Sequence, residues 1–400
     1  MVNLNNSVHL KATDKVNPLQ KEWEIKTLGS CEFSSSITAN SFVQEERILL
    51  HTTFNTATNQ LIDTPLESLE KAGPRAKLYF DGENTTIGIV TCGGICPAVN
   101  NVIRSLVNTA SYKYNVKKIV GFKYGYEGLN PETSEWTILT PADVKDIHTF
   151  GGSLLGTSRG PQDVKVMVDY LQKMEINILF TIGGDGTQKG SLEISKEAER
   201  RGYKLSVVGV PKTIDNDISY VEKCFGFETA VALSQQPLRA AHEEARSAKF
   251  GIGIVKLMGR LSGFIALSAA LASGDVNLLL LPEMKFTMDD VTNYLIQRFK
   301  KRSHCLILVS EGAGQDLCTI EEENGPKTDK SGNVVLKDIG LFLKDEIKNR
   351  LKKFGISPTI KYIDPSYTIR SSAPIANDAV FALQLGQMAV HAAMAVTYDH

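Results

Sequence analysis

The stretch Ile176-Asn-Ile-Leu-Phe-Thr-Ile-Gly-Gly-Asp-Gly-Thr187 decides the fold class. Its first part is a short apolar run, which is typical of a strand buried on both faces. The glycine-rich end leads into a charged helical pattern over residues 188–201, and a second apolar run follows at 205–210. A strand, a helix and another strand in this order predict a βαβ unit and therefore a parallel sheet.

The same alternation continues on both sides of this stretch. Further strands are predicted at 87–90, 118–122, 251–257, 276–281, 305–309 and 360–363. Further helices are predicted at 98–112, 162–173, 227–246, 263–272, 289–301, 336–353 and 375–396. We therefore predict an α/β fold with two Rossmann-like lobes built on parallel-rich sheets. The expected boundaries are a polar N-terminal extension (1–82), a first lobe (83–220, with 373–400 returning to it), a second lobe (221–372) and a surface loop at 321–335.

Composition and charge exclude several classes of partner. The chain has 44 Lys and Arg against 45 Asp and Glu, interspersed without a basic block, so we expect no nucleic acid and no anionic membrane as partner. The longest apolar run, at 276–282, is far shorter than the ~20 residues of a membrane span. The N-terminus lacks the layout of a secretory signal, so we expect a cytoplasmic location. A C-terminal organelle signal stays open, because the chain stops directly after its last predicted helix.

The six cysteines are few for this length, and we expect reduced thiols. Cys92 and Cys96 could suggest a zinc pair, but no second Cys/His pair accompanies them.

Polar clusters directly follow six of the predicted strands. They are Thr91–Gly94, Gly183–Thr187, Pro211–Asp217, Met258–Arg260, Glu311-Gly312 and Asp364–Arg370. In an open parallel sheet, ligands bind beyond the carboxyl ends of the strands. This placement therefore predicts one shared site, although Gly93-Gly94 alone could be a plain tight turn.

The segment Gly183-Gly-Asp-Gly-Thr187 has the composition of a phosphate-binding loop. Glycine lets backbone N–H groups approach phosphate oxygens, and the next helix adds its positive N-terminal dipole. Asp185 is a candidate ligand for Mg²⁺. The alternative is a strand-to-helix turn without a ligand.

The segment Thr213-Ile-Asp-Asn-Asp217 is the most informative motif. On an extended segment, two carboxylates two residues apart point the same way. Phosphoryl transfer to a hydroxyl needs one carboxylate as a base and others near the metal. Solvated loop aspartates are the alternative.

Basic residues are also expected in these loops. Arginine and lysine suit phosphate ligands, although each one alone would more often be a surface residue. The five basic residues are Arg159, Lys212, Arg260, Lys361 and Arg370.

Taken together and in order, these motifs resemble the phosphofructokinases over about residues 75 to 400. The resemblance rests on Cys92-Gly-Gly-Ile-Cys-Pro97, Gly151-Gly-Ser-Leu-Leu-Gly-Thr-Ser-Arg159, Gly183–Thr187, Pro211–Asp217, Met258-Gly-Arg260 and Tyr367-Thr-Ile-Arg370. More narrowly, the chain resembles the ATP-using, protist-type members of the pyrophosphate-phosphofructokinase lineage. The resemblance implies transfer of the γ-phosphoryl of ATP to the 1-hydroxyl of fructose 6-phosphate with Mg²⁺, giving fructose 1,6-bisphosphate and ADP in glycolysis.

The resemblance also implies a role for each motif residue. Asp215 would be the general base and Asp185 would hold Mg²⁺. Thr213, Arg159 and Lys212 would contact the transferred phosphoryl group. The first lobe would bind the nucleotide through Gly94, Arg159, Gly184, Asp185, Gly186, Thr187 and Gln188. The sugar-phosphate site would be shared between the lobes. The first lobe would contribute Thr213, Asp215 and Asp217, and the second lobe would contribute Met258, Gly259, Arg260, Glu311, Lys361, Tyr367 and Arg370. A homotetramer or homodimer and allosteric control are implied as well.

The phosphoryl donor depends on Gly186. Pyrophosphate users of the family carry an aspartate there, which obstructs the nucleotide, whereas glycine leaves room for ATP. Lys212, by contrast, is typical of pyrophosphate users. We therefore favour ATP, with a pyrophosphate-dependent enzyme as the alternative. A catalytically silent regulatory subunit is a third reading, but Asp185, Asp215 and Asp217 are all present. Ala98 stands where relatives usually have glycine, which would tighten the nucleotide loop. Gly251 stands where bacterial relatives use an arginine of the neighbouring subunit to bind the sugar phosphate, which weakens any transfer of their allosteric scheme.

Overall fold

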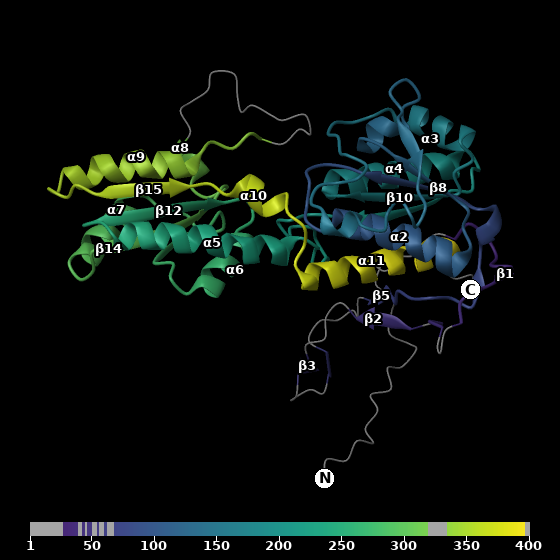
Figure 1. The fold of residues 1–400 in the computed structure, drawn as a ribbon, viewed down its shortest axis with the longest axis horizontal. Coiled ribbons are helices and arrows are strands. Elements are labelled where there is room, and N and C mark those ends of the chain that lie inside the picture. Colours follow the sequence, from purple (N-terminus) through teal and green to yellow (C-terminus); the bar gives the residue numbers. More distant parts are fainter. Residues whose placement is uncertain are drawn as a thin grey trace, which may run out of the picture.

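The computed structural model describes residues 27–38, 42–44, 46–49, 68–318 and 334–396, together with the strand segments 54–55 and 60–61. Figure 1 shows two α/β lobes side by side. The predicted fold class, two lobes with parallel-rich sheets, is confirmed. Most of the surface loop predicted at 321–335 lies outside the described residues.

The first lobe contains a five-stranded sheet in the order β11-β10-β7-β8-β9. The strands are β7 (Thr86–Thr91), β8 (Lys118–Phe122), β9 (Trp136–Ile138), β10 (Ile178–Gly183) and β11 (Ser206–Pro211). Every residue of β7 and β10 is buried, as their unbroken apolar runs predict. β9 was not predicted; it pairs antiparallel to β8 at the edge of the sheet. The helices of this lobe are α2 (Val99–Tyr114), α3 (Val164–Lys173) and α4 (Asp185–Arg200).

The second lobe contains a four-stranded parallel sheet in the order β13-β14-β12-β15. Its strands are β12 (Gly251–Leu257), β13 (Leu278–Leu280), β14 (His304–Ser310) and β15 (Thr359–Ile363). Its helices are α5 (Phe227–Arg246), α6 (Phe264–Ser273), α7 (Met288–Phe299), α8 (Gln315–Cys318), α9 (Ile339–Lys352) and α10 (Ser366–Arg370). The two short helices, α8 and α10, were not predicted, because four or five residues carry no helical period.

The last helix, α11 (Ala376–Ala395), packs against α2 and β11 of the first lobe. Ser105 on α2 donates a hydrogen bond to the Leu383 carbonyl at 2.6 Å. The two helices approach closely at Gly386, where a Cβ atom would lie only 2.6 Å from the Cβ of Ser105. Glycine at this position is therefore required by the packing of α11.

Short antiparallel pairs form the described part of the N-terminal segment. β1 (Phe33–Ser34) pairs with β6 (Lys77–Leu78), β2 (Arg47–Leu49) with β5 (Ser68–Glu70), and β3 (Phe54–Asn55) with β4 (Gln60–Leu61). Strands of two or three residues are too short to show an alternating pattern, which is why the sequence did not predict them.

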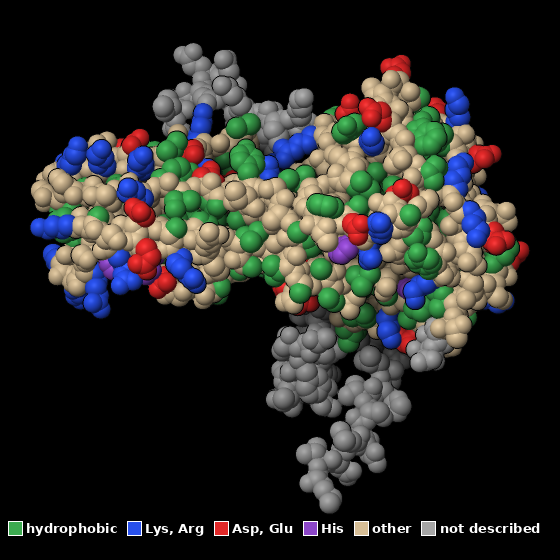
Figure 2. Space-filling model, in the orientation of Figure 1, with side chains coloured by type: hydrophobic (Ala, Val, Ile, Leu, Met, Phe, Trp, Pro, Cys, Tyr) green, Lys and Arg blue, Asp and Glu red, His purple; other side chains and the backbone are tan. Residues whose placement is uncertain are grey.

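The surface carries charges of both signs, and Figure 2 shows them spread over both lobes on the visible face. All six cysteines are free thiols, as predicted. In the part of the chain that the structure describes, none of the helices has the length and apolar character of a membrane span.

Candidate active site

Three predicted site residues from both lobes meet around a fourth, Gly94, just after β7. A Cβ atom on Gly94 would lie 3.4 Å from Nη2 of Arg159 and 3.8 Å from Nη1 of Arg370. Lys212, directly after β11, donates a hydrogen bond from Nζ to the Gly94 carbonyl at 2.7 Å. Three cationic side chains thus converge on one glycine loop. Such a concentration of positive charge favours anionic ligands, above all phosphate groups.

Lys212 is buried, with 5% of its surface exposed. Burial lowers its pKa, while the nearby cysteines and Asp215 oppose this change and Arg159 adds to it. A buried ammonium group is costly unless an anion lies near it. The position of Lys212 is therefore suited to a ligand that brings negative charge into the loop.

The segment that carries Asp215 turns sharply, so the predicted extended conformation is wrong. Asn216 has a φ of 56°, in the left-handed region that asparagine tolerates. Its Oδ1 accepts a hydrogen bond from the Cys224 N–H at 2.7 Å, and its Nδ2 donates to the Glu222 carbonyl at 3.1 Å. These two bonds stabilise the turn, and they place the carboxylates of Asp215 and Asp217 in different surroundings.

Asp217 and Asp215 share one neighbour, Thr213. The Thr213 hydroxyl donates to Oδ1 of Asp217 at 2.7 Å and accepts from the backbone N–H of Asp215 at 3.1 Å. Thr213 therefore fixes the loop geometry, in addition to the substrate contact predicted for it.

Asp215 has the environment of a base. Its Oδ1 is buried without a hydrogen-bond partner among the described residues. Burial raises its pKa to about 7, and the negative charges of Asp217 and Glu311 add to this effect, while Arg260 and Lys212 oppose it. A carboxylate with a pKa near neutral pH can accept a proton from a hydroxyl group efficiently.

The second lobe contributes the loop after β12, whose shape depends on Glu311. Its Oε1 accepts hydrogen bonds from the backbone N–H groups of Arg260 at 2.8 Å and Gly259 at 3.4 Å. Gly312 lies so close that a Cβ atom there would be 1.9 Å from the Arg260 carbonyl oxygen. Met258 is buried in the core. The Ser262 hydroxyl donates to the Asp215 carbonyl at 3.5 Å, so the two lobes meet at this site.

The glycine-rich segment of the first lobe is partly helical. α4 begins at Asp185 with Gly184 as its N-cap, three residues earlier than predicted. A Cβ atom on Gly186 would meet no described atom within 4 Å, so this position faces open space. Asp185 is largely exposed and pairs with Lys189 at 2.7 Å.

Thr187 and Gln188 contribute to the frame of the site. The hydroxyl of Tyr126 donates to the Thr187 carbonyl at 2.6 Å, and Nε2 of Gln188 donates to the Gly183 carbonyl at 2.9 Å. These bonds attach the start of α4 to β10 and to the segment that follows β8. The backbone N–H groups of Thr187 and Gln188 donate to the Gly184 carbonyl at 2.9 and 3.0 Å, which closes the first turn of α4.

A Mg²⁺ ion fits this site by the chemistry of its donors. Within the described residues, no three His, Cys, Asp or Glu side chains gather into a complete metal cage. Mg²⁺ is commonly bound by one or two carboxylates together with water and substrate phosphates, rather than by an all-protein cage. The exposed carboxylate of Asp185, at the start of α4, could serve as one such ligand.

Arg370 and Tyr367 both lie on α10. The guanidinium carbon of Arg370 is 4.8 Å from the centre of the Tyr367 ring. Nε of Arg370 is buried, and no described residue forms a hydrogen bond with it.

Lys361 lies elsewhere. It is the middle residue of β15 rather than part of a loop, and its Nζ is 3.5 Å from Oε2 of Glu244 on α5. The side chains of a strand's middle residues project from the faces of the sheet, so Lys361 is separated from the carboxyl edge.

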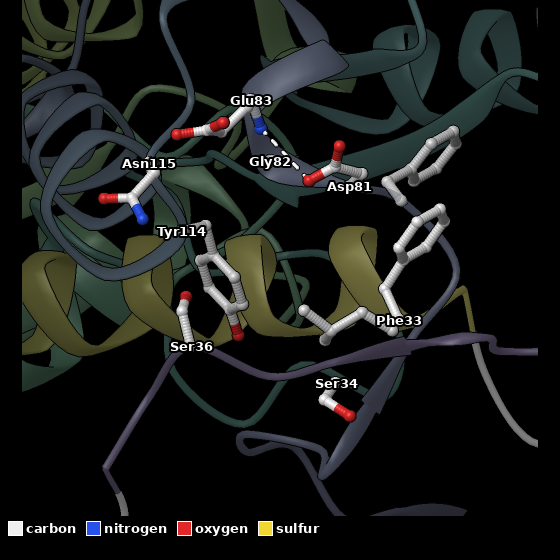
Figure 3. A pocket seen from close by; sticks show the side chains of 10 residues that line it. Phe33, Ser34, Ser36, Asp81, Gly82, Glu83, Tyr114 and Asn115 are labelled. Atoms are coloured by element: carbon white, nitrogen blue, oxygen red, sulfur yellow. Dashed lines mark hydrogen bonds between the residues drawn. The ribbon is translucent and has the colours of Figure 1, made fainter.

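A small pocket of about 80 Å³ lies away from this site. Figure 3 shows it between the N-terminal segment, with Phe33, Ser34 and Ser36, and the residues around Asp81 and Tyr114. It contains none of the predicted site residues.

A two-lobed α/β fold in which carboxylates, cations and a glycine-rich segment directly follow parallel strands defines a class of protein, the α/β proteins whose ligands lie beyond the carboxyl ends of their strands. The phosphofructokinase family model matches residues 86–393, and the chain belongs to the phosphofructokinase family. An ATP-dependent 6-phosphofructokinase of Entamoeba histolytica is 50% identical over 338 residues, which cover 84% of this chain and 77% of the relative.

Solved structures show the same fold. The structure of phosphofructokinase from Saccharomyces cerevisiae has a TM-score of 0.61 at 24% identity, over 77% of this chain and 41% of that chain, so this chain spans less than half of its length. A pyrophosphate-dependent phosphofructokinase from Marinobacter aquaeolei has a TM-score of 0.65 at 21% identity, over 78% of this chain and 76% of that chain. The predicted relationship to the phosphofructokinases is confirmed, and the Marinobacter aquaeolei structure shows the shared fold.

Proposed function

We propose that this chain is an ATP-dependent 6-phosphofructokinase, which transfers the γ-phosphoryl group of ATP to the 1-hydroxyl of fructose 6-phosphate. The observation that carries the proposal is the environment of Asp215. The Oδ1 atom of this half-buried side chain has no hydrogen-bond partner among the described residues, burial raises the pKa of the carboxyl to about 7, and the charges of Arg260 and Lys212 act on it from both lobes. This combination supports one group that removes a proton and several that bind the phosphates on either side of it.

In the proposed reaction, Asp215 accepts the proton of the attacking hydroxyl. Lys212 and Arg159 lie next to Gly94, and they stabilise the negative charge of the phosphoryl group during transfer. Arg260, Tyr367 and Arg370 bind the sugar phosphate. Mg²⁺, when bound at Asp185, would neutralise charge on the nucleotide phosphates.

ATP as the donor is supported by the open space beside Gly186. An aspartate side chain there would project from the first turn of α4 toward the region where nucleotide phosphates would lie, and its charge would repel them. The names of curated relatives such as the Entamoeba histolytica protein support the same donor.

A homo-oligomer in the cytoplasm is also part of this proposal. Four apolar side chains are exposed on α6 and the residues before it: Leu261 (73%), Phe264 (49%), Leu267 (39%) and Leu271 (76%). On a helix, residues 264, 267 and 271 share one face. An apolar face of this kind supports contact with a second copy of the chain. Light scattering of the purified protein tests the proposal, and a monomer at micromolar concentration would contradict it.

A coupled assay with each donor tests the proposed reaction. Purified enzyme is mixed with fructose 6-phosphate and Mg²⁺, and either ATP or pyrophosphate is added. We expect turnover with ATP and little with pyrophosphate. Turnover with pyrophosphate alone would identify the alternative enzyme, and binding of sugar phosphate without turnover would identify a silent subunit.

A further inference from the structure

An ion-pair cluster connects three segments beneath α10. Lys256, near the end of β12, has a side chain that is only 12% exposed. Its Nζ is 2.9 Å from Oδ2 of Asp364, which follows β15, and 3.2 Å from Oδ2 of Asp338, which precedes α9. The hydroxyl of Tyr362 donates to the other oxygen of Asp338 at 2.8 Å. One ammonium group therefore joins two carboxylates that come from different elements.

Asp364 determines how α10 begins. Its Oδ1 accepts hydrogen bonds from the backbone N–H of Ser366 at 3.1 Å and from the Ser366 hydroxyl at 2.6 Å. Its Oδ2 is left for Lys256. Oδ1 therefore stabilises the first turn of α10, and Oδ2 connects that turn to Lys256 on β12.

The position of α10 matters because it carries Tyr367 and Arg370. A helix of five residues has little stability of its own, so its orientation depends on its anchors. Nη1 of Arg370 reaches the Gly94 loop of the other lobe, and its guanidinium group stacks on Tyr367. A small rotation of α10 at Asp364 would therefore displace the guanidinium group from the site.

The pair stays charged over a wide pH range. Burial lowers the pKa of Lys256, but the hydrogen bonds and charge of Asp364 and Tyr362 more than offset this, and the net pKa is raised. Burial raises the pKa of Asp364, but the hydrogen bonds from Ser366 and Lys256 outweigh it, and the net pKa is lowered. The anchor is consequently intact at every pH at which an enzyme of this kind is assayed.

We propose that Lys256 and Asp364 are positioning residues, which hold α10 so that Tyr367 and Arg370 face the sugar phosphate. This inference rests on the proposed function, because it assigns the anchor to the fructose 6-phosphate side of the site. Neither residue is proposed to touch a substrate. Their effect should therefore appear in the binding of one substrate and not the other.

The test compares steady-state constants of three variants with those of the wild type. Lys256→Met keeps the length of the side chain and removes its charge, and Asp364→Asn keeps the acceptor for Ser366 and weakens the pair. In both variants we expect the KM for fructose 6-phosphate to rise by about tenfold, while the KM for ATP changes by less than about twofold. The double variant should be no worse than either single variant, because both remove the same interaction.

Asp338→Asn is the matched control. It removes the other carboxylate from Lys256 but keeps an oxygen that caps α9 through Gly340 and Leu341. We expect it to leave both KM values within about twofold of the wild type, because α9 carries none of the proposed substrate contacts. Thermal unfolding of each variant shows how much general stability has been lost.

The possible results distinguish the positioning role of Lys256 and Asp364 from the proposed function itself. A rise confined to the KM for fructose 6-phosphate in Lys256→Met and Asp364→Asn supports the inference. Equal changes in both KM values, or an equal effect of Asp338→Asn, would overturn it, because the cluster would then act through general stability. If Lys256→Met does not fold, the KM values of Asp364→Asn alone test the inference, and a rise confined to the KM for fructose 6-phosphate again supports it. A wild type that is inactive with either donor would instead refute the proposed function.

Discussion

Replacing Asp215 by asparagine should make the protein both inactive and more stable. The substitution keeps the shape of the side chain and removes its charge. Burial raises the pKa of this carboxyl from 3.8 to about 7. Because a difference of one pH unit in pKa corresponds to 1.36 kcal/mol, the charged form of Asp215 costs up to about 4 kcal/mol of folding free energy.

The sign of the pH dependence follows from the raised pKa. Below about pH 4, Asp215 is protonated in both the folded and the unfolded chain and costs nothing. As the pH rises from about 4 to 7, the unfolded chain releases its proton first, so the wild type loses stability. Asparagine does not titrate. The variant should therefore gain stability relative to the wild type by up to about 4 kcal/mol at pH 8, and by progressively less as the pH falls toward 5.

Urea unfolding of both proteins at pH 5 and pH 8 measures this difference, and the coupled assay measures the lost activity. We expect kcat to fall by about 10² to 10⁴, the usual contribution of a general base. In the wild type, kcat/KM should rise with pH, reach half of its maximum near pH 7 and level off about one pH unit higher, because only the ionised carboxylate accepts the proton. The quantity compared is the unfolding free energy of the variant minus that of the wild type. If this difference is the same at pH 5 and pH 8, or if the variant retains kcat, then Asp215 is not the desolvated base described here.

Two further substitutions test other parts of the site. Gly186→Asp places a carboxylate in open space at the first turn of α4, where it should not disturb the fold but should repel nucleotide phosphates. We expect the KM for ATP to rise by about tenfold or more, with the unfolding free energy within about 1 kcal/mol of the wild type; unchanged ATP kinetics would contradict the donor argument. Asp378→Ala removes a fully buried carboxylate that accepts hydrogen bonds from the N–H of Thr229 at 2.7 Å and from its hydroxyl at 2.6 Å, at the start of α5. Urea unfolding should show a loss of about 2 kcal/mol, and a loss below about 0.5 kcal/mol would mean that these two hydrogen bonds contribute little.

Buried strands and long helices could be predicted from the sequence because their patterns are strong. The strands 118–122 and 251–257 and the helix 227–246 have the predicted bounds. Each is a run of apolar residues, or a long amphipathic repeat, that local side chains alone specify. The placement of polar clusters at strand ends followed directly from these assignments.

Features that depend on contacts between distant residues could not be predicted. The turn at Asn216 is held by Glu222 and Cys224, which no periodic pattern connects to it. Lys256 looks like one more residue of an apolar strand, and only the packing of β15 and α9 around it reveals its two carboxylate partners. The early start of α4 reflects the N-cap at Gly184, which a glycine-rich pattern obscures.

The most direct test of the central claim is phosphorus-31 NMR of the wild-type enzyme with fructose 6-phosphate, ATP and Mg²⁺. This measurement distinguishes transfer to the sugar from hydrolysis of the nucleotide. The account predicts a second sugar phosphomonoester signal, from C1, that grows in step with ADP. Release of inorganic phosphate with the sugar unchanged would contradict it, because Asp215 would then activate water rather than the hydroxyl of the sugar.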